Sequence, residues 1–237
     1  ALEDLIRAIK SKISSAEMAM ISDKTLEVRR QVLAERNVFM EGVTPTWDNL
    51  PITPARMMAE IAQSLPGNAM VVDDSLSNRA SLRRFIQAHK RGDLIGVRGQ
   101  SIGGGIGATM GVQCANPEKK VFGIIGDGSA MMTIQGLWTA ANENIPCVFI
   151  ICNNGMYRIL KTNYAIYQRD VLRETEIAGP NLLHADFATP FDVASIANSM
   201  GVYGERIDCP EQIKPAIANA ASMNKPVLLD IIIDGSM

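Results

Sequence analysis

Residues 121–129 read VFGIIGDGS, and residues 147–154 read CVFIICNN. Each stretch is a short apolar run that ends in glycine or polar residues, which is typical of a buried β-strand followed by a turn. The 24 residues between Gly128 and Asn153 hold one helical segment and the second apolar run. The two stretches therefore predict a strand, a helix and a second strand that lies parallel to the first, because such units are right-handed and share one sheet.

The same alternation of apolar runs and helical segments continues on both sides of this unit. We expect strands at residues 69–72, 94–97, 121–125, 147–152, 203–207 and 227–233. We expect helices at residues 77–89, 102–114, 130–143, 190–200 and 210–223. This order predicts an α/β fold with a doubly wound, mainly parallel six-stranded sheet and helices on both faces. Ligands of such sheets bind at the carboxyl ends of the strands.

The first fifty residues have a different character. Apolar residues recur at helical spacing from Leu2 to Ile13, and a second helical stretch covers residues 24–40. Residues 41–54 then contain three prolines and a glycine among polar residues, which is the composition of a linker. We therefore expect a domain boundary between residues 1–50 and residues 51–237.

Composition excludes several classes of protein. The chain has 23 basic and 25 acidic residues, so it offers no strong field for nucleic acid or for an anionic membrane surface. Its apolar runs are far shorter than the roughly 18 residues that span a bilayer. The four cysteines form no C-x-x-C pair. We expect a reduced, cytoplasmic protein that binds neither nucleic acid nor membranes.

Polar side chains follow the two central strands. Asp127 and Asn154 should face one another at the same edge of the sheet, because they follow neighbouring parallel strands. A carboxylate, an amide oxygen and a backbone carbonyl form an oxygen-only ligand set that suits Mg²⁺. Gly126 and Gly128 allow close approach of the backbone to a diphosphate, and a helix that begins at Ser129 directs free N–H groups at an anion. Taken alone, a GDG sequence after a strand also fits an ordinary tight turn.

The GDG sequence, the 24 residues that follow and the NN pair resemble the thiamine diphosphate (ThDP) motif of enzymes such as pyruvate decarboxylase, benzoylformate decarboxylase and acetolactate synthase. The resemblance implies that the cofactors are ThDP and Mg²⁺. It implies metal ligands at Asp127, Asn154 and the backbone carbonyl of Met156, and diphosphate contacts at the GDGS turn and at Met156. Residues 51–237 would then form the diphosphate-binding domain, and residues 1–50 the tail of a preceding central domain with its linker.

The glycine-rich stretch 99–107, GQSIGGGIG, follows an expected strand. It fits a flexible loop or a dinucleotide-type glycine loop. The resemblance implies instead that Ile102 is the bulky residue that wedges between the two rings of the cofactor. The carbonyl of Gln100 would accept a hydrogen bond from the 4′-amino group, and Gly99 and Ser101 would complete this part of the cofactor site.

The resemblance also assigns functions to two further segments. Residues 73–77, DDSLS, follow the first expected strand, and Ser77 would contact the diphosphate. The two aspartates fit a helix-capping turn equally well. Beyond Asn154, the resemblance places Tyr157, Ile159 and Leu160 at the substrate end of the cofactor, although these residues also fit the apolar face of an ordinary amphipathic helix.

The resemblance implies non-oxidative decarboxylation of a 2-oxo acid. Residues 134–146 are most similar to benzoylformate decarboxylase, but Thr162 and Asn163 lie where that enzyme has an aromatic residue. The alternative enzymes are an acetolactate synthase-like carboligase and a 2-hydroxyacyl-CoA lyase. The non-enzymatic alternative is a degenerate nucleotide-binding regulatory module. In the enzymes that the sequence resembles, the glutamate that activates ThDP belongs to a pyrimidine-binding domain, and no segment of this sequence looks like that domain. We expect that domain in the same polypeptide or in a separate chain, within a homodimer or homotetramer.

Overall fold

The computed structural model describes residues 2–88, 90–97, 102–174 and 182–236. The chain divides into two compact units, Ala1–Pro45 and Thr46–Met237. The assignment of residues 1–50 to a preceding central domain stays a prediction. None of the described helices is long and apolar enough to cross a bilayer.

The first unit consists of two helices, α1 (Leu2–Lys12) and α2 (Ser15–Val43). Ser14 begins α2 with a capping box, in which its hydroxyl oxygen accepts the Glu17 N–H and the Glu17 carboxylate accepts the Ser14 N–H. No described residue of either helix is buried. The short 3₁₀ helix η1 (Thr44–Thr46) follows.

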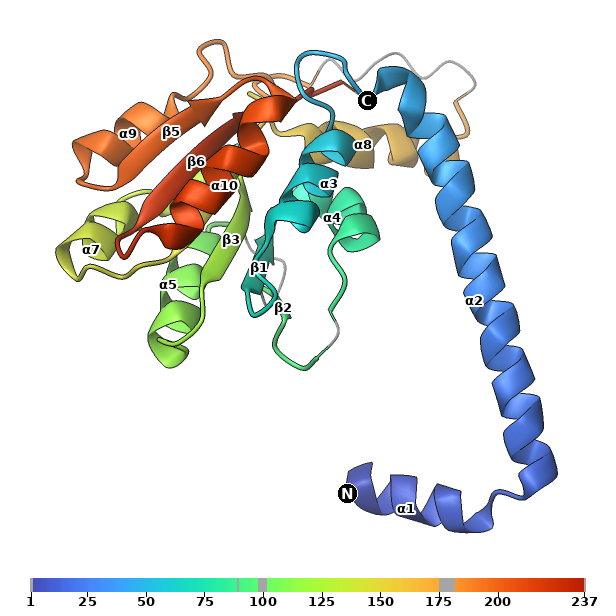
Figure 1. Ribbon diagram of the computed structural model, residues 1–237. Helices are drawn as coiled ribbons and strands as arrows, with labels where there is room; N and C mark the ends of the chain where they lie inside the picture. Colours follow the sequence, from blue (N-terminus) through green and yellow to red (C-terminus); the bar gives the residue numbers. More distant parts are fainter. Residues whose placement is uncertain (1, 89, 98–101, 175–181, 237) are drawn as a thin grey trace. The chain divides into compact units, whose positions relative to one another are not determined.

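The second unit is built on a six-stranded sheet (Figure 1). Its strands are β1 (Met70–Asp74), β2 (Leu94–Gly96), β3 (Val121–Gly126), β4 (Val148–Asn153), β5 (Tyr203–Ile207) and β6 (Val227–Ile232). They lie in the order β2-β1-β3-β4-β6-β5, and every neighbouring pair is parallel. The predicted six-stranded parallel sheet is confirmed.

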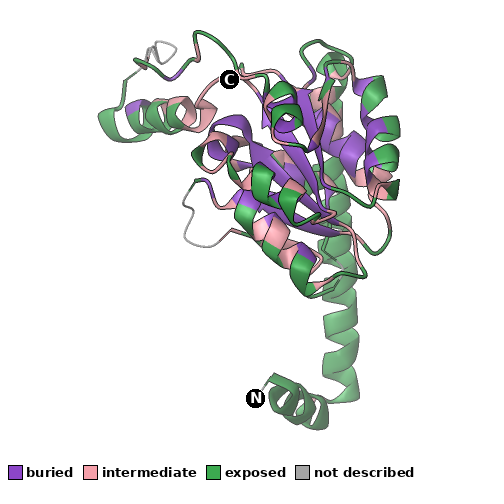
Figure 2. Cartoon of the chain, turned by 90° about the vertical axis from the view of Figure 1, so that its left-hand side faces the viewer, coloured by how far each residue is buried: buried purple, intermediate pink, exposed green. Residues whose placement is uncertain are grey.

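Helices cover both faces of this sheet, and the strands bury side chains on each (Figure 2). In β4, Val148 and Ile150 pack on one face against α3 (Pro54–Ser64), α4 (Arg79–Phe85) and α10 (Ile213–Ser222). Phe149 and Ile151 pack on the other face against α5 (Gly105–Ala115), α7 (Gly136–Asn142) and α9 (Val193–Ser199). This two-sided burial explains why β3 and β4 are apolar throughout.

Several helices are shorter than the sequence predicts. The predicted helix 130–143 is two helices, α6 (Asp127–Met132) and α7, because the chain leaves the helical conformation at Thr133, whose hydroxyl donates to the Gly103 carbonyl at 2.7 Å. The predicted helix 77–89 is a 3₁₀ turn, η2 (Leu76–Asn78), followed by α4. The remaining elements are α8 (Arg158–Tyr167), the π-helical turn η4 (Gln168–Leu172) and η5 (Pro210–Gln212).

The strand order places the carboxyl ends of β1, β3 and β4 side by side. From β1 the chain first adds β2 on one side and then returns to add β3 on the other, so the direction of winding reverses between β1 and β3. At such a reversal the connections leave in opposite directions and open a crevice. The GDGS turn follows β3 directly at this crevice.

The start of α5 packs so closely against the sheet that a methyl group has no room there. A Cβ on Gly105 would lie 2.8 Å from the Asp74 Cβ and 2.9 Å from the Ile125 Cγ1, whereas a Cβ on Gly107 meets no atom within 4 Å. We expect Gly105→Ala to lower the free energy of unfolding by about 1 to 3 kcal/mol through overpacking. Gly107→Ala, the matched control, should raise it by up to about 1 kcal/mol through helix propensity. Urea denaturation measures both, and equal effects would contradict the packing argument.

Candidate functional site

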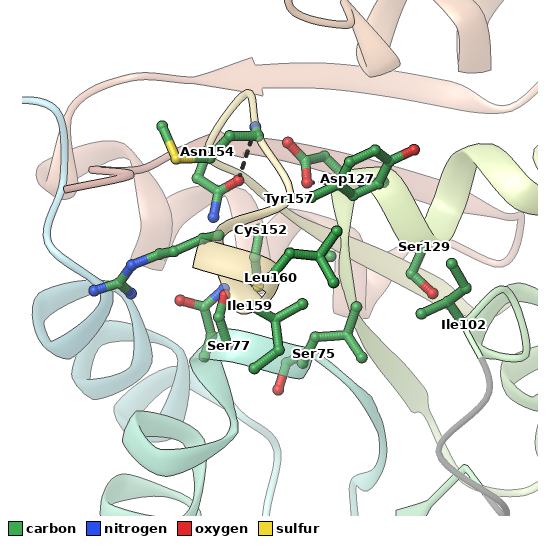
Figure 3. Close-up of a pocket in the computed structure, with 16 residues that line it drawn as sticks. Ser75, Ser77, Ile102, Asp127, Ser129, Cys152, Asn154, Tyr157, Ile159 and Leu160 are labelled. Carbon is green, nitrogen blue, oxygen red and sulfur yellow. Dashed lines mark hydrogen bonds between the residues drawn. The ribbon is translucent and has the colours of Figure 1, made fainter. Parts of the chain in front are cut away.

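A cavity of about 180 Å³ opens at the carboxyl ends of β1, β3 and β4 (Figure 3). Its floor is formed by the turns that follow these strands, and the start of α8 closes one side. The residues that line it are Ser75, Leu76, Ser77, Asn78, Ile102, Gly126, Asp127, Gly128, Ser129, Cys152, Asn154, Met156, Tyr157, Arg158, Ile159 and Leu160. Every described residue that the sequence analysis assigned to the site is among them.

Asp127 is the only acidic residue among the described residues that line the cavity. Its side chain is 3% exposed, and its carboxylate oxygens accept backbone N–H groups of Gly128 at 2.7 Å and Gly155 at 2.8 Å. Burial raises the pKa of Asp127 to about 6 despite these hydrogen bonds. No ion pair within the described part of the chain offsets its charge, so the ionised carboxylate favours an added cation.

Asn154 reaches the cavity from the neighbouring strand. Gly126 pairs with Cys152 in the β3–β4 register, which brings the residues after both strands to the same level. The Asn154 Oδ1 accepts the Met156 N–H at 3.1 Å, the dashed line in Figure 3, and keeps a second lone pair. Gly155 has a φ of +65°, which allows the tight turn between Asn154 and Met156.

The glycine segment is tied to the GDGS turn by buried hydrogen bonds. The Asp74 Oδ2 accepts the Ser129 hydroxyl at 2.6 Å and the Gly105 N–H at 2.9 Å, and the Ser129 Oγ accepts the Gly103 N–H at 2.7 Å. Gly103 has a φ of +93°, and a Cβ there would lie 2.7 Å from the Met132 Cβ. The Ser129 hydroxyl thus uses its one donor hydrogen within the protein, so only the backbone N–H of this residue can donate to an anionic ligand.

Asp73 and Asp74 have different roles, which the sequence left open. Asp73 accepts the N–H and hydroxyl of Ser75 at 3.0 and 2.7 Å and pairs with the Arg79 Nε at 3.0 Å. It therefore shapes the turn after β1 but caps no helix, because neither η2 nor α4 begins with a side-chain cap. Asp74 instead joins β1 to the glycine segment, and neither composition nor spacing signalled that contact, because its partners are distant in sequence.

Ile102 lies at the mouth of the cavity next to Ser129 and is 45% exposed (Figure 3). Gly99, Gln100 and Ser101, which the sequence analysis placed beside it, lie outside the described residues. Ser77 lines the opposite wall after Leu76, whose φ of +49° is unusual for a residue with a side chain.

Tyr157 covers the GDGS turn. A Cβ on Gly128 would lie 2.5 Å from the Tyr157 Cε1, so only glycine lets the ring lie this close. The Tyr157 ring packs edge-on against Phe187, with centroids 4.8 Å apart. This packing makes Tyr157 a fixed wall of the cavity. Ile159 and Leu160 follow on α8, and Leu160 is 51% exposed.

Asn153, the first residue of the NN pair, turns away from the cavity. Its Nδ2 donates to the Asp230 Oδ1 at 2.9 Å and to the Phe191 carbonyl at 2.9 Å. Asp230 is buried, and its other oxygen accepts the Val193 N–H at 3.1 Å. This pair therefore holds the end of β4 to β6 and to the start of α9.

Comparisons with known proteins agree with this geometry. The family described as "Thiamine pyrophosphate enzyme, C-terminal TPP binding domain" matches residues 81–231. The chain belongs to this family. Thiamine pyrophosphate is another name for ThDP, and residues 81–231 therefore form a ThDP-binding domain.

The relatives of this domain include enzymes of two named activities. The chain is 33% identical over 80% of its length to a protein of Mycobacterium tuberculosis that is named as an acetolactate synthase large subunit. It is 30% identical over 76% of its length to benzoylformate decarboxylase of Pseudomonas aeruginosa. It spans 36% and 32% of these two proteins. The chain also superposes on the solved structure of 4-hydroxybenzoylformate decarboxylase of Rhodococcus jostii RHA1, with a TM-score of 0.68 and 28% sequence identity. The superposition covers 78% of this chain and 33% of the decarboxylase.

The residues of this ThDP-binding domain fit a diphosphate with a divalent cation. The described residues hold no group of three His, Cys, Asp or Glu side chains that would bind a metal without a further ligand. The cavity instead offers one carboxylate, one amide oxygen and one backbone carbonyl. This set leaves coordination positions for phosphate oxygens, which matches the way Mg²⁺ binds in phosphate-containing sites.

The raised pKa of Asp127 predicts a pH effect on the metal-free domain. Between the ordinary pKa of an aspartate and the folded value of about 6, the folded state binds more protons than the unfolded state, so stability falls as pH rises. From about pH 4 to pH 7 wild type should lose roughly 2 to 2.5 kcal/mol relative to Asp127→Asn, which carries no charge. Urea unfolding in the presence of a chelator measures this difference. A gap independent of pH would show that burial does not destabilise the carboxylate.

Proposed function

We propose that Asp127, Asn154 and the backbone carbonyl of Met156 bind Mg²⁺, which anchors the diphosphate of ThDP in this cavity. The observation that carries the proposal is the buried, uncompensated Asp127 carboxylate, which lies beside Asn154 and Met156 at the ends of neighbouring strands. Ser77 and the backbone of Gly126, Gly128 and Ser129 surround the space for the phosphates.

The rest of the cavity would orient the organic part of the cofactor and the substrate. Bound ThDP supplies an electron sink for the loss of CO₂ from a 2-oxo acid. Ile102 would support the bent arrangement of the two rings, and Gln100 would accept a hydrogen bond from the 4′-amino group. Tyr157, Ile159 and Leu160 would line the substrate end and exclude water there.

We propose that the complete enzyme is a lyase that decarboxylates a 2-oxo acid without oxidation, and that it is cytoplasmic. The named activity of the Pseudomonas aeruginosa relative and of the Rhodococcus jostii structure supports this reaction. The acetolactate synthase-named relative, at 33% identity, supports carboligation as the second candidate. Thr162 and Asn163 in place of an aromatic residue argue against a large aryl substrate.

Turnover would need a pyrimidine-binding domain that supplies the activating glutamate, in the same polypeptide or in a separate chain. The chain spans about a third of its relatives, which leaves room for that domain in a longer protein. Apolar side chains are exposed at the cavity mouth and along α8, namely Ile102, Leu160, Tyr164, Ile166 and Tyr167. This surface is suited to contact with such a domain within a homodimer or homotetramer.

Metal and cofactor binding should be coupled through Asp127. Asp127→Ala removes the only carboxylate among the described residues that line the cavity, so the diphosphate would lose its bridging cation and Mg²⁺-dependent ThDP binding should disappear. Isothermal calorimetry with and without Mg²⁺ measures the effect. Asp192→Ala, which removes an exposed carboxylate that caps α9, serves as the control. Wild-type affinity in the Asp127→Ala protein would refute the metal assignment.

The reaction can be assayed after the upstream domain is added, either fused or as a separate chain. We expect release of CO₂ from at least one 2-oxo acid in a panel from pyruvate to benzoylformate, and no release by the Asn154→Ala variant. The 237-residue chain alone should be inactive, because it lacks the activating glutamate. Equal activity of the chain alone would contradict the need for a partner domain, and acetolactate formation from pyruvate would favour carboligation.

A further inference from the structure

A second buried carboxylate, that of Asp230, lies outside the cavity. Asp230 belongs to β6, is 0% exposed, and is not among the described residues that line the cavity. It forms no ion pair within the part of the chain that the structure describes. Burying a charge without a counter-charge is costly, so such a carboxylate is weak evidence for a contribution to stability. Its hydrogen bonds indicate another role.

Asp230 joins the end of β4 to the chain segment that leads into α9. Its Oδ1 accepts the Asn153 Nδ2 hydrogen at 2.9 Å, and its Oδ2 accepts the Val193 N–H at 3.1 Å. Asn153 donates its second amide hydrogen to the Phe191 carbonyl at 2.9 Å. A carboxylate offers one acceptor oxygen to each of the two donors, whereas an asparagine would offer an oxygen to only one of them. The acid therefore suits this position better than the amide does.

The same segment is attached at its other end to the turn that follows β4. The Phe187 N–H donates to the Gly155 carbonyl at 2.9 Å, and the Tyr157 N–H donates to the Ala185 carbonyl at 2.8 Å. Residues 185–193 are thus fixed to the turn at one end and to the Asp230 carboxylate at the other.

This attachment sets the direction of the Met156 backbone. Met156 faces Asp186 in an antiparallel bridge whose two hydrogen bonds are made by the neighbouring residues. In such a pair, a residue directs its own N–H and C=O away from the partner segment. The Met156 N–H accordingly donates to the Asn154 Oδ1, and the Met156 carbonyl lies on that same side. Both metal ligands proposed after β4 therefore depend on residues 185–187 for their direction.

Direction matters more to Mg²⁺ than to Ca²⁺, which carries the same charge. Mg²⁺ demands near-octahedral geometry at about 2.0–2.1 Å, whereas Ca²⁺ accepts about six to eight oxygens at about 2.3–2.6 Å in flexible arrangements. A turn that is held less firmly should therefore lose more affinity for Mg²⁺ than for Ca²⁺.

We infer that Asp230, acting through Asn153, is a positioning residue that holds the turn after β4 in the geometry that Mg²⁺ requires. The inference rests on the proposed function, because it assumes that Asn154 and Met156 bind the metal. It goes further in assigning the ion selectivity of the site to two residues outside the cavity.

The test compares the two ions in the 237-residue chain, with ThDP as the ligand. Equilibrium dialysis gives the metal concentration at which ThDP binding is half-maximal, for Mg²⁺ and for Ca²⁺ separately. Asp230→Asn should raise this concentration about tenfold or more for Mg²⁺, because loss of a residue that orients a metal ligand typically has an effect of that size. For Ca²⁺ the rise should be about threefold or less. Loss of charge alone would affect both ions alike, so the ratio of the two concentrations reports position.

Asn153→Ala provides an independent arm, which also serves if Asp230→Asn does not fold. It removes the hydrogen bonds to β6 and to Phe191 and leaves the Asp230 charge in place. The ratio of the Mg²⁺ to the Ca²⁺ concentration should again rise, by about threefold or more.

Asp192→Ala is the matched control. Asp192 also lies at the start of α9, where its exposed carboxylate accepts the Ser195 N–H at 2.9 Å. This variant should keep both wild-type concentrations. An equal loss of Mg²⁺ preference in the control would show that any loosening of α9 is sufficient, and it would overturn the role of Asp230.

The remaining outcomes separate the inference from the proposed function. If the wild-type chain shows no metal-dependent binding of ThDP, the proposed function fails. If wild type shows it and both variants keep the wild-type ratio, only the inference fails, and a lowered urea midpoint would then make the pair purely structural. Equal weakening for both ions in Asp230→Asn, with no effect of Asn153→Ala, would leave Asp230 an electrostatic part only and would also overturn the inference.

Discussion

The buried carboxylate of Asp74 holds together the parts of this domain on which the site depends. One of its oxygens accepts hydrogen bonds from the Ser129 hydroxyl and from the Gly105 N–H, which belong to the GDGS turn and to the start of α5. Burial raises the pKa of Asp74, whereas these two hydrogen bonds favour the charged form. The same Ser129 oxygen accepts the Gly103 N–H, so three segments distant in sequence share one buried network.

This network explains why the glycines occur where they do. Gly105 and Gly103 allow the backbone to approach Asp74 and Met132 more closely than any side chain would permit. Ile102 immediately precedes these glycines, so the position of its side chain at the cavity mouth follows from the network below it. A buried polar network whose members are all satisfied rigidifies its surroundings, which is the property that the role proposed for Ile102 requires.

The site also illustrates how a parallel sheet concentrates unbalanced charge. All six strands run in one direction, so the turns after β1, β3 and β4 meet at one edge. Asp127 is buried at this edge without an ion pair in the described residues, which is unfavourable for the protein by itself. Under the proposed function, a divalent cation and an anionic ligand would relieve this cost together.

The sequence by itself determined the strands and most of the residues that line the cavity. Apolar runs bounded by glycine and polar residues located β3 and β4, because strands buried on both faces must be apolar throughout. The spacing from Asp127 to Asn154 was enough to place both at one edge, since it fits a single helical crossover followed by one strand. Only the tertiary structure decided the order of the strands, the break between α6 and α7 and the separate roles of Asp73 and Asp74. It also revealed that the buried Asn78 Oδ1 and Arg158 Nε have no hydrogen-bond partner in the described part of the chain. These features depend on contacts between residues far apart along the chain, and local patterns of hydrophobicity carry no information about such contacts.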